Sequence, residues 1–188
     1  MTVNYQDVLD FWFDEKNIPL QFNGGEEFDN EIRSRFLKTW EKASEGLLVD
    51  WRETLNGRLA EVIVLDQFSR NLWRNDIRTY TQDKMAIALA QEALKHPDYP
   101  TLDPMMKKFF LLPFMHSESL ELHEWANKYF QLLGDENTLY FEELHLEVLK
   151  KFGRYPYQNA DLNRESTPEE LVALKEAAEK GGFYRPKE

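Results

Sequence analysis

Apolar residues recur every three or four positions along nearly the whole chain, and runs that alternate apolar with polar residues are scarce. The stretch from Glu26 to Ala43 is typical, because Phe28, Ile32, Phe36 and Trp40 are spaced four apart. A repeat of about 3.6 residues places such positions on one face of an α-helix. The sequence therefore predicts an all-α protein.

Residues that favour helix ends divide this pattern into about eight helices. Thr167, Pro168 and Glu170 combine a cap, a first-turn proline and a capping-box glutamate. Pro113 is expected to stop one helix and Ser117 to cap the next. The expected helices cover about 5–12, 26–43, 52–71, 81–94, 104–112, 117–133, 137–152 and 168–180. The connections are mostly short, so neighbouring helices should pack antiparallel in a bundle.

The length of 188 residues suits one helical domain over residues 1–188, in which a polar strap at 154–166 joins the last two helices. Hydrophobic residues make up 42% of the chain, which is enough for a core. The N-terminus has neither a basic start nor a continuous apolar run, and the run at 109–115 is too short to cross a bilayer. We therefore expect a cytoplasmic protein.

Charge and cysteine content exclude several classes of function. The formal net charge of −11 disfavours nucleic acids and anionic membranes as partners. The chain has no cysteine, which excludes disulfides, thiolate metal sites and cysteine nucleophiles. It also has no glycine-rich phosphate loop and no G-x-S-x-G motif.

Polar side chains end the most apolar helix. Asp66 follows Val62 by four residues and so continues the inward face, and Arg70 lies four residues beyond Asp66, where the two can pair. Gln67 and Asn71 have the same spacing. A buried carboxylate and guanidinium must be paired or face a cavity, so the segment is interpreted either as a structural ion pair or as part of a site.

Two histidines are candidates for proton transfer. His116 precedes the predicted cap, and Glu118 in the expected first turn would oppose the positive end of the helix dipole. His145 lies on an apolar stripe, where a hydrogen-bonded core histidine is the more common case. Glu142 and His145 match one half of a di-iron bundle motif, but the second half is absent. We expect no metal site and no cofactor.

The strap carries Arg154, Asn159 and Arg164 with little nearby charge to balance the arginines. Gly153 should end the preceding helix, and Thr167 should begin the next. We expect the strap to face inward, toward Asp66 and the other polar groups at the end of the central helix.

Several separated blocks resemble the motifs of a bacterial family, domain of unknown function 924. They read DFWF, GRLA, VLDQFSRN, PFMHSE, HLEVLKKFGRYP and NADLNREST, in that order, within a span from Val8 to about Leu174. The resemblance implies an all-helical fold similar to tetratricopeptide-like superhelices, and it implies no particular activity, substrate or cofactor. The family's polar positions fall on Asp66, Gln67, Arg70, Asn71, His116, Ser117, Glu118, His145, Gly153, Arg154, Pro156, Asn159 and Arg164.

This chain departs from the family pattern in the strap. Where the family tends to have P-H-R-N, this chain has Pro156, Tyr157, Gln158 and Asn159. Where the family tends to have L-G-R, Asn163 replaces the glycine. A mechanism that depends on the missing histidine or arginine is therefore disfavoured.

Three hypotheses for function stay open. In the first, Arg70, Arg154 and Arg164 hold a small polar or anionic molecule in a pocket, with His116 or His145 as the proton-transfer group. In the second, the chain is a tetratricopeptide-like scaffold that binds a protein or peptide. In the third, the polar motifs only hold the fold together. Whether the protein is an enzyme is not decided, because no nucleophile with its base is present.

Overall fold

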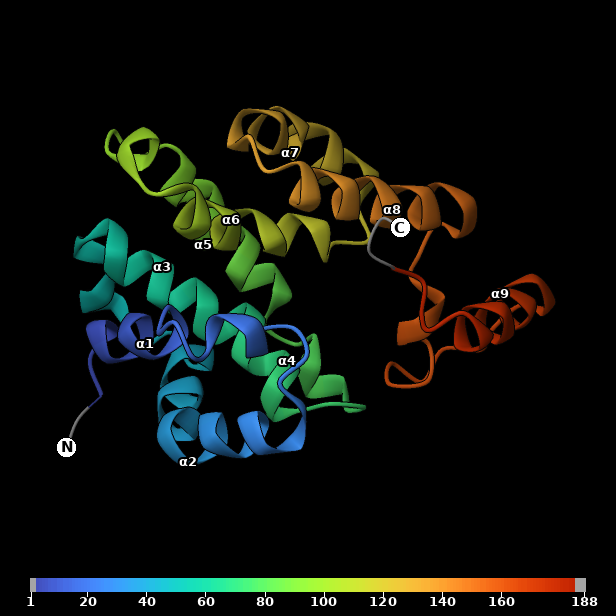
Figure 1. Cartoon of the computed structure of the whole chain (residues 1–188), viewed down its shortest axis with the longest axis horizontal. Helices are drawn as coiled ribbons and strands as arrows, with labels where there is room; N and C mark the ends of the chain where they lie inside the picture. The colour runs from blue at the N-terminus through green and yellow to red at the C-terminus, as the bar shows by residue number, and fades with distance from the viewer. Residues whose placement is uncertain (1–2, 185–188) are drawn as a thin grey trace. The chain divides into compact units, whose positions relative to one another are not determined.

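The computed structural model describes residues 3–184, and they group into two compact units, Met1–Phe110 and Leu111–Glu188. Each unit is described by itself. Unit 1 contains α1 (Tyr5–Trp12), α2 (Gly25–Ser44), α3 (Leu55–Ile63), α4 (Ser69–Leu72) and α5 (Asp83–Leu94), drawn from blue to green in Figure 1. Unit 2 contains α7 (Leu120–Leu133), α8 (Glu136–Phe152) and α9 (Pro168–Glu179). Helix α6 (Pro104–Met115) contributes residues to both.

The prediction of an all-α protein is confirmed, since residues 3–184 contain helices and no strand. Between α3 and α4 lies η3 (Val64–Phe68), a π-helical turn, and the three run without a break from Leu55 to Leu72. Counted as one helix, they give the predicted eight α-helices in the described part of the chain. The single domain and the tetratricopeptide-like arrangement stay predictions.

The core of unit 1 surrounds α3 and η3. Helix α3 contacts α1 and α5, and α2 contacts η3 and α4. Every residue from Leu59 to Leu65 is fully buried. Glu61 is the polar exception, and its carboxylate accepts hydrogen bonds from Arg52 at 2.6 and 2.7 Å. Aromatic rings from α1, α2 and the π turn pack against one another in this core: Phe11, Trp12, Phe28, Phe36 and Phe68.

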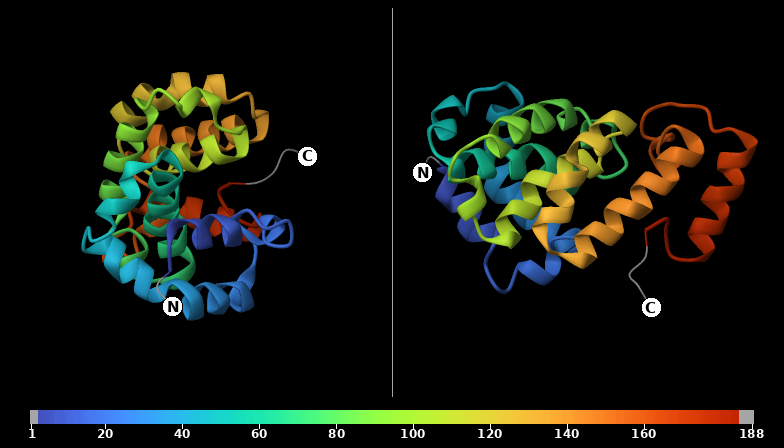
Figure 2. Two further views of the ribbon diagram at one scale, coloured as in Figure 1. Left: turned by 90° about the vertical axis from the view of Figure 1, so that its left-hand side faces the viewer. Right: turned by 90° about the horizontal axis from the view of Figure 1, so that it is seen from above.

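Unit 2 is built on the pair α7 and α8, which contact each other and run antiparallel because only two residues join them. Gly134 and Gly153, each with φ above +70°, follow the two helices in the left-handed conformation, and Gly153 ends α8 as predicted. The strap then leads to α9, as Figure 2 shows between the orange and red helices. Thr167 and Glu170 form the predicted capping box at the start of α9.

Two predicted helix boundaries are wrong. Pro113 lies inside α6, and the helix continues to Met115. A proline within a helix loses one hydrogen bond, and here the flanking side chains of Leu111 and Phe114 are fully buried, so their packing keeps the helix intact. The cap of α7 is Ser119, whose hydroxyl accepts from the backbone N–H of Leu122, and not Ser117.

A close approach between α3 and the preceding turn requires glycine at position 57. A Cβ atom there would lie 2.0 Å from the carbonyl oxygen of Trp51. We predict that Gly57→Ala lowers the free energy of unfolding by about 2 kcal/mol, because the backbone must move to relieve the clash. Chemical denaturation followed by circular dichroism measures the change. The control is Asn56→Ala, an exposed neighbour on the same helix, which should change stability by less than about 0.5 kcal/mol. Equal effects of the two variants would contradict the prediction.

Candidate functional site

Four of the predicted site residues lie in unit 1, at the end of the central helix. Asp66 is fully buried, and its carboxylate lies 3.0 Å from Nη1 of Arg70, which confirms the predicted pairing of these two residues. Arg70 also donates to both carboxylate oxygens of Asp83, at 3.0 and 3.1 Å. Gln67 donates to Asp66 at 2.5 Å. The charge of Arg70 is thus balanced by two carboxylates.

The fourth residue, Asn71, belongs to a separate contact on the α2 side of the helix. Its side-chain amide donates to Asp29 of α2 at 2.7 Å. Arg74 forms a bidentate ion pair with the same carboxylate, and the hydrogen bond that it donates to Asp29 raises the pKa of Arg74. Sequence analysis did not identify Asp29 or Arg74, because their pairing joins positions 45 residues apart.

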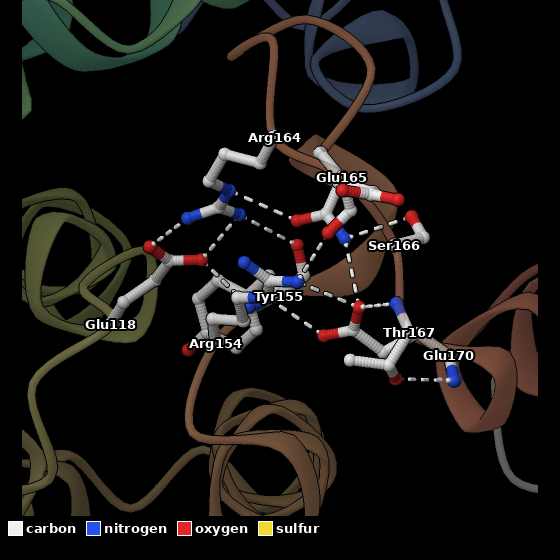
Figure 3. A network of polar contacts seen from close by, with 9 residues as sticks. Glu118, Arg154, Tyr155, Arg164, Glu165, Ser166, Thr167 and Glu170 are labelled. Carbon is white, nitrogen blue, oxygen red and sulfur yellow. Dashed lines mark hydrogen bonds and ion pairs between the residues drawn. The ribbon is translucent and has the colours of Figure 1, made fainter.

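The other predicted residues lie in unit 2, where Glu118 and Arg164 form the central contact of the strap. Nη1 and Nη2 of Arg164 donate to the two carboxylate oxygens of Glu118 at 2.6 and 2.9 Å (Figure 3). The backbone N–H of Tyr155 donates to the same carboxylate at 2.6 Å. Arg164 also donates to the side chain of Asn159 and to the carbonyl of Tyr155. One carboxylate therefore fixes both ends of the strap.

Arg154 fixes the strap to α9. It donates to both carboxylate oxygens of Glu170, at 2.7 and 2.8 Å, and to the carbonyl of Glu165 (Figure 3). Glu170 is buried and also accepts from Asn159 and from the backbone N–H of Thr167. The hydrogen bond from Arg154 is the main cause that lowers the pKa of Glu170 to about 2, against the opposing effect of burial.

The predicted role of Glu118 is wrong. Because Ser119 caps α7, Glu118 precedes the helix and is not in its first turn, where the acidic residue is Glu121. Its partner is a guanidinium 46 residues away and not the helix dipole. The strap does face its own protein, as predicted, since Tyr155 is fully buried and Asn159 is 1% exposed. That Asp66 lies among its partners stays a prediction.

A buried histidine that sequence analysis passed over is central to unit 2. Nε2 of His123 lies 2.8 Å from the carbonyl of Ser117, and a carbonyl only accepts, so this nitrogen carries a proton. Nδ1 lies 2.5 Å from a carboxylate oxygen of Glu142. The hydroxyl of Tyr155 donates to the carbonyl of Met115 and lies 3.1 Å from Nε2. The spacing of His123 with Ala126, Phe130 and Leu133 on the buried face of α7 could have indicated its burial.

The two predicted histidines lie near each other in unit 2. The ring centres of His116 and His145 are 6.4 Å apart, and the ring of Tyr184 stacks on His145 at 3.5 Å. Nδ1 of His145 lies 2.7 Å from the carbonyl of Phe141 and therefore donates to it. Burial raises the pKa of Tyr155, 5.7 Å away, far above its usual range, so its hydroxyl stays protonated. Within residues 3–184, no group of three or more His, Asp or Glu side chains could hold a metal ion.

Unit 1 has two grooves beside α2 that the sequence did not reveal. The polar groove has a volume of about 630 Å³ and is lined by residues that include Asn23, Glu26, Asp29, Asn30, Arg33 and Arg74. The cationic groove has a volume of about 560 Å³ and is lined by residues that include Arg33, Lys38, Lys42, Leu47, Leu48 and Trp51. Five residues at intervals of four line one groove or the other: Glu26, Asn30, Ser34, Lys38 and Lys42. This polar row is offset by two residues from the apolar row of α2. Its spacing in the sequence could have indicated which residues of α2 line the two grooves.

A family model described as "Bacterial protein of unknown function (DUF924)" matches residues 8–178. The chain belongs to the DUF924 family. Among solved structures it is similar to the protein of unknown function ATU0120 from Agrobacterium tumefaciens, with a TM-score of 0.85 and 33% sequence identity. That similarity covers 92% of this chain and 97% of the other. A comparison with curated proteins gives no match. No helix in the described part of the chain is long and apolar enough to cross a membrane.

The structure explains one departure from the DUF924 pattern. Asn163, which stands where the family tends to have glycine, has φ of 52°. Asparagine is among the few residues with a side chain that adopt this left-handed conformation readily. The turn before Arg164 is therefore retained without the glycine.

The Glu118–Arg164 pair supports a stability prediction. The side chains are 28% and 22% exposed, so removal of either leaves a poorly hydrated charge. We predict that Glu118→Ala and Arg164→Ala each lower the free energy of unfolding by about 3 kcal/mol. The double variant should lose clearly less than the sum of the two, by at least about 1 kcal/mol. Chemical denaturation measures all three. Glu121→Ala, an exposed change in α7, is the control, and additive effects of the two changes would contradict a direct interaction.

The lowered pKa of Glu170 gives a pH dependence. Its folded-state pKa is about 2, below the ordinary value of 4.5, so the unfolded chain binds the proton more tightly. The stability that Glu170 contributes is thus complete above about pH 4.5 and is lost as the pH falls toward 2. We predict that Glu170→Gln flattens the dependence of the melting temperature on pH between 5 and 2.5, whereas Glu169→Gln, its exposed neighbour, leaves that slope as in the wild type. Identical slopes for all three proteins would refute this assignment.

Proposed function

We propose that the protein binds an anionic molecule with an apolar part, held in the cationic groove of unit 1. The observation that supports this most directly concerns the pairing of the cationic side chains that line this groove. Within residues 3–184, Arg33, Lys38 and Lys42 have no carboxylate partner. Arg33 donates to the carbonyl of Leu72, and its guanidinium lies 5.2 Å from the ring centre of Trp73. These cations remain available to an anion.

The groove contrasts with the charge of the whole chain. Its lining has four cationic side chains, those of Arg33, Arg35, Lys38 and Lys42, and one acidic side chain, that of Asp50. Arg35 is paired with Glu31 at 3.3 Å, which leaves a local excess of positive charge in a protein of net charge −11. Such a region attracts anions locally.

The apolar lining favours a ligand that is more than a simple ion. Trp51 is partly exposed, Leu47 is 61% exposed, and both line the groove with Leu48. An aromatic or aliphatic group can pack against them while its anionic group contacts Lys38 and Lys42. The ligand class is therefore an anion that carries an apolar body.

The arginines first predicted to hold the anion are used differently. Arg70, Arg154 and Arg164 each form a bidentate pair with a carboxylate of the same unit. An anionic ligand at any of them would have to displace that carboxylate. Their part in the proposal is to hold the fold, and the proposal includes binding but no reaction. A cytoplasmic location belongs to the same proposal.

Anilinonaphthalene sulfonate tests the proposal, since it joins an anionic group to an aromatic body and its fluorescence rises on binding. We predict that the wild type binds this probe and that Lys38→Glu with Lys42→Glu weakens binding by at least about tenfold, since two attractions become repulsions. Binding should also weaken at high salt, because the lysines are exposed.

The control carries the same charge change elsewhere. Lys84→Glu with Lys150→Glu alters two exposed lysines that line neither groove, and it should bind the probe as the wild type does. If both double variants lose binding equally, only net charge matters and the proposal is refuted. Circular dichroism of each variant verifies that it is folded.

A further inference from the structure

We infer that the occupant of the cationic groove is an extended acidic peptide segment of a partner protein, which continues past Arg33 into the polar groove. The inference rests on the proposed function and specifies its ligand. Arg33 lines both grooves, so the two meet at its side chain. A molecule bound by Lys38 and Lys42 can therefore extend along α2 toward Asn30 without leaving the lining.

The length of the combined site matches a peptide. Gly25 at one end and Lys42 at the other are both on α2, and a helical rise of 1.5 Å per residue separates them by about 26 Å. An extended chain advances about 3.3 Å per residue, so roughly eight residues span this distance. A small organic acid would fill only one of the two grooves.

The polar groove offers the groups that a peptide backbone requires. Within residues 3–184, the side-chain amides of Asn23 and Asn30 have no hydrogen-bond partner, and both residues are exposed. Each amide has donors and an acceptor, as does each peptide unit, so the two are complementary. Beside them, the carboxylate of Asp29 is fixed by Asn71 and Arg74 and forms an ordered wall.

The charges of the two grooves indicate which types of residue each half of the peptide carries. In the polar groove, Asp29 is paired with Arg74 and Glu26 adds a negative charge, so this half disfavours acidic residues and suits neutral polar ones. In the cationic groove, the excess positive charge suits aspartate and glutamate. Phe22 and Leu47, which are 55% and 61% exposed, line opposite ends and can each receive an apolar side chain of the peptide.

Fluorescence anisotropy with labelled eight-residue peptides tests the inference. Two peptides carry neutral polar residues and one leucine in one half, and glutamates and one leucine in the other, with the acidic half at either end. We expect one of the two to bind the wild type with a dissociation constant of about 1–100 μM. Its isolated four-residue acidic half should bind at least about tenfold more weakly, because half of the contacts are lost.

Variants in the polar groove separate this inference from the proposed function. Asn23→Ala with Asn30→Ala should weaken binding of the eight-residue peptide by at least about fivefold, because two hydrogen bonds are lost. It should leave the binding of anilinonaphthalene sulfonate unchanged, since neither asparagine lines the cationic groove. Gln6→Ala with Asn56→Ala, which changes two exposed amide residues of unit 1 that line neither groove, is the matched control.

The outcomes are distinct. If the probe binds through Lys38 and Lys42 but the four-residue half binds as tightly as the whole peptide, the inference is overturned and the proposed function stands. If binding of neither the probe nor the peptide depends on Lys38 and Lys42, the inference and the proposed function are both overturned. If Lys38→Glu with Lys42→Glu instead abolishes a concentration-dependent dimer in sedimentation measurements, the occupant is a second copy of this chain, and the inference is again overturned.

Discussion

The carboxylate of Glu118 accepts hydrogen bonds from three donors of the strap, and the order of the C-terminal unit depends on it. The two guanidinium nitrogens of Arg164 and the backbone N–H of Tyr155 converge there from both ends of the loop. A loop of this length would otherwise lose considerable conformational entropy on folding without apolar burial to offset it. With its ends fixed, the loop can hold the ring of Tyr155 in the core and place the guanidinium of Arg154 beside the carboxylate of Glu170.

Half-buried arginines in both units are likewise paired with carboxylates. Arg52, Arg70, Arg154 and Arg164 each have a carboxylate in bidentate or near-bidentate geometry. Such pairs offset the loss of hydration that each charge would suffer alone. The polar side chains of the sequence therefore fall into two groups. In the proposed function, the polar motif residues hold the fold together, and the ligand contacts the exposed row of α2, which those motifs do not include.

The helices were predictable because each signal is local. The capping box at Thr167, the glycines after α7 and α8, and the pair of Asp66 with Arg70 all lie within four residues in sequence. For the candidate site, the sequence indicated which polar residues to consider but not which residues they contact. Glu118 was assigned to a dipole because its partner lies 46 positions away, and no local pattern can indicate such a pairing. The burial of His123 could have been predicted from its spacing along α7, but its contact with Glu142, 19 positions away on α8, could not.

The π turn at Val64–Phe68 constrains how the central helix tolerates changes in length. Such a turn holds one residue more than the α-helical geometry would, so everything after it is rotated by about 100° relative to a regular helix. Asp83 and Asp29, which contact Arg70 and Asn71, lie where that rotation directs the two side chains. Loss of one residue from the turn would restore a more regular helix and turn both side chains away from their partners. The extra residue thus sets the rotation of the helix that follows the π turn. The contacts of Arg70 and Asn71 therefore depend on the length of the π turn, although neither residue lies within it.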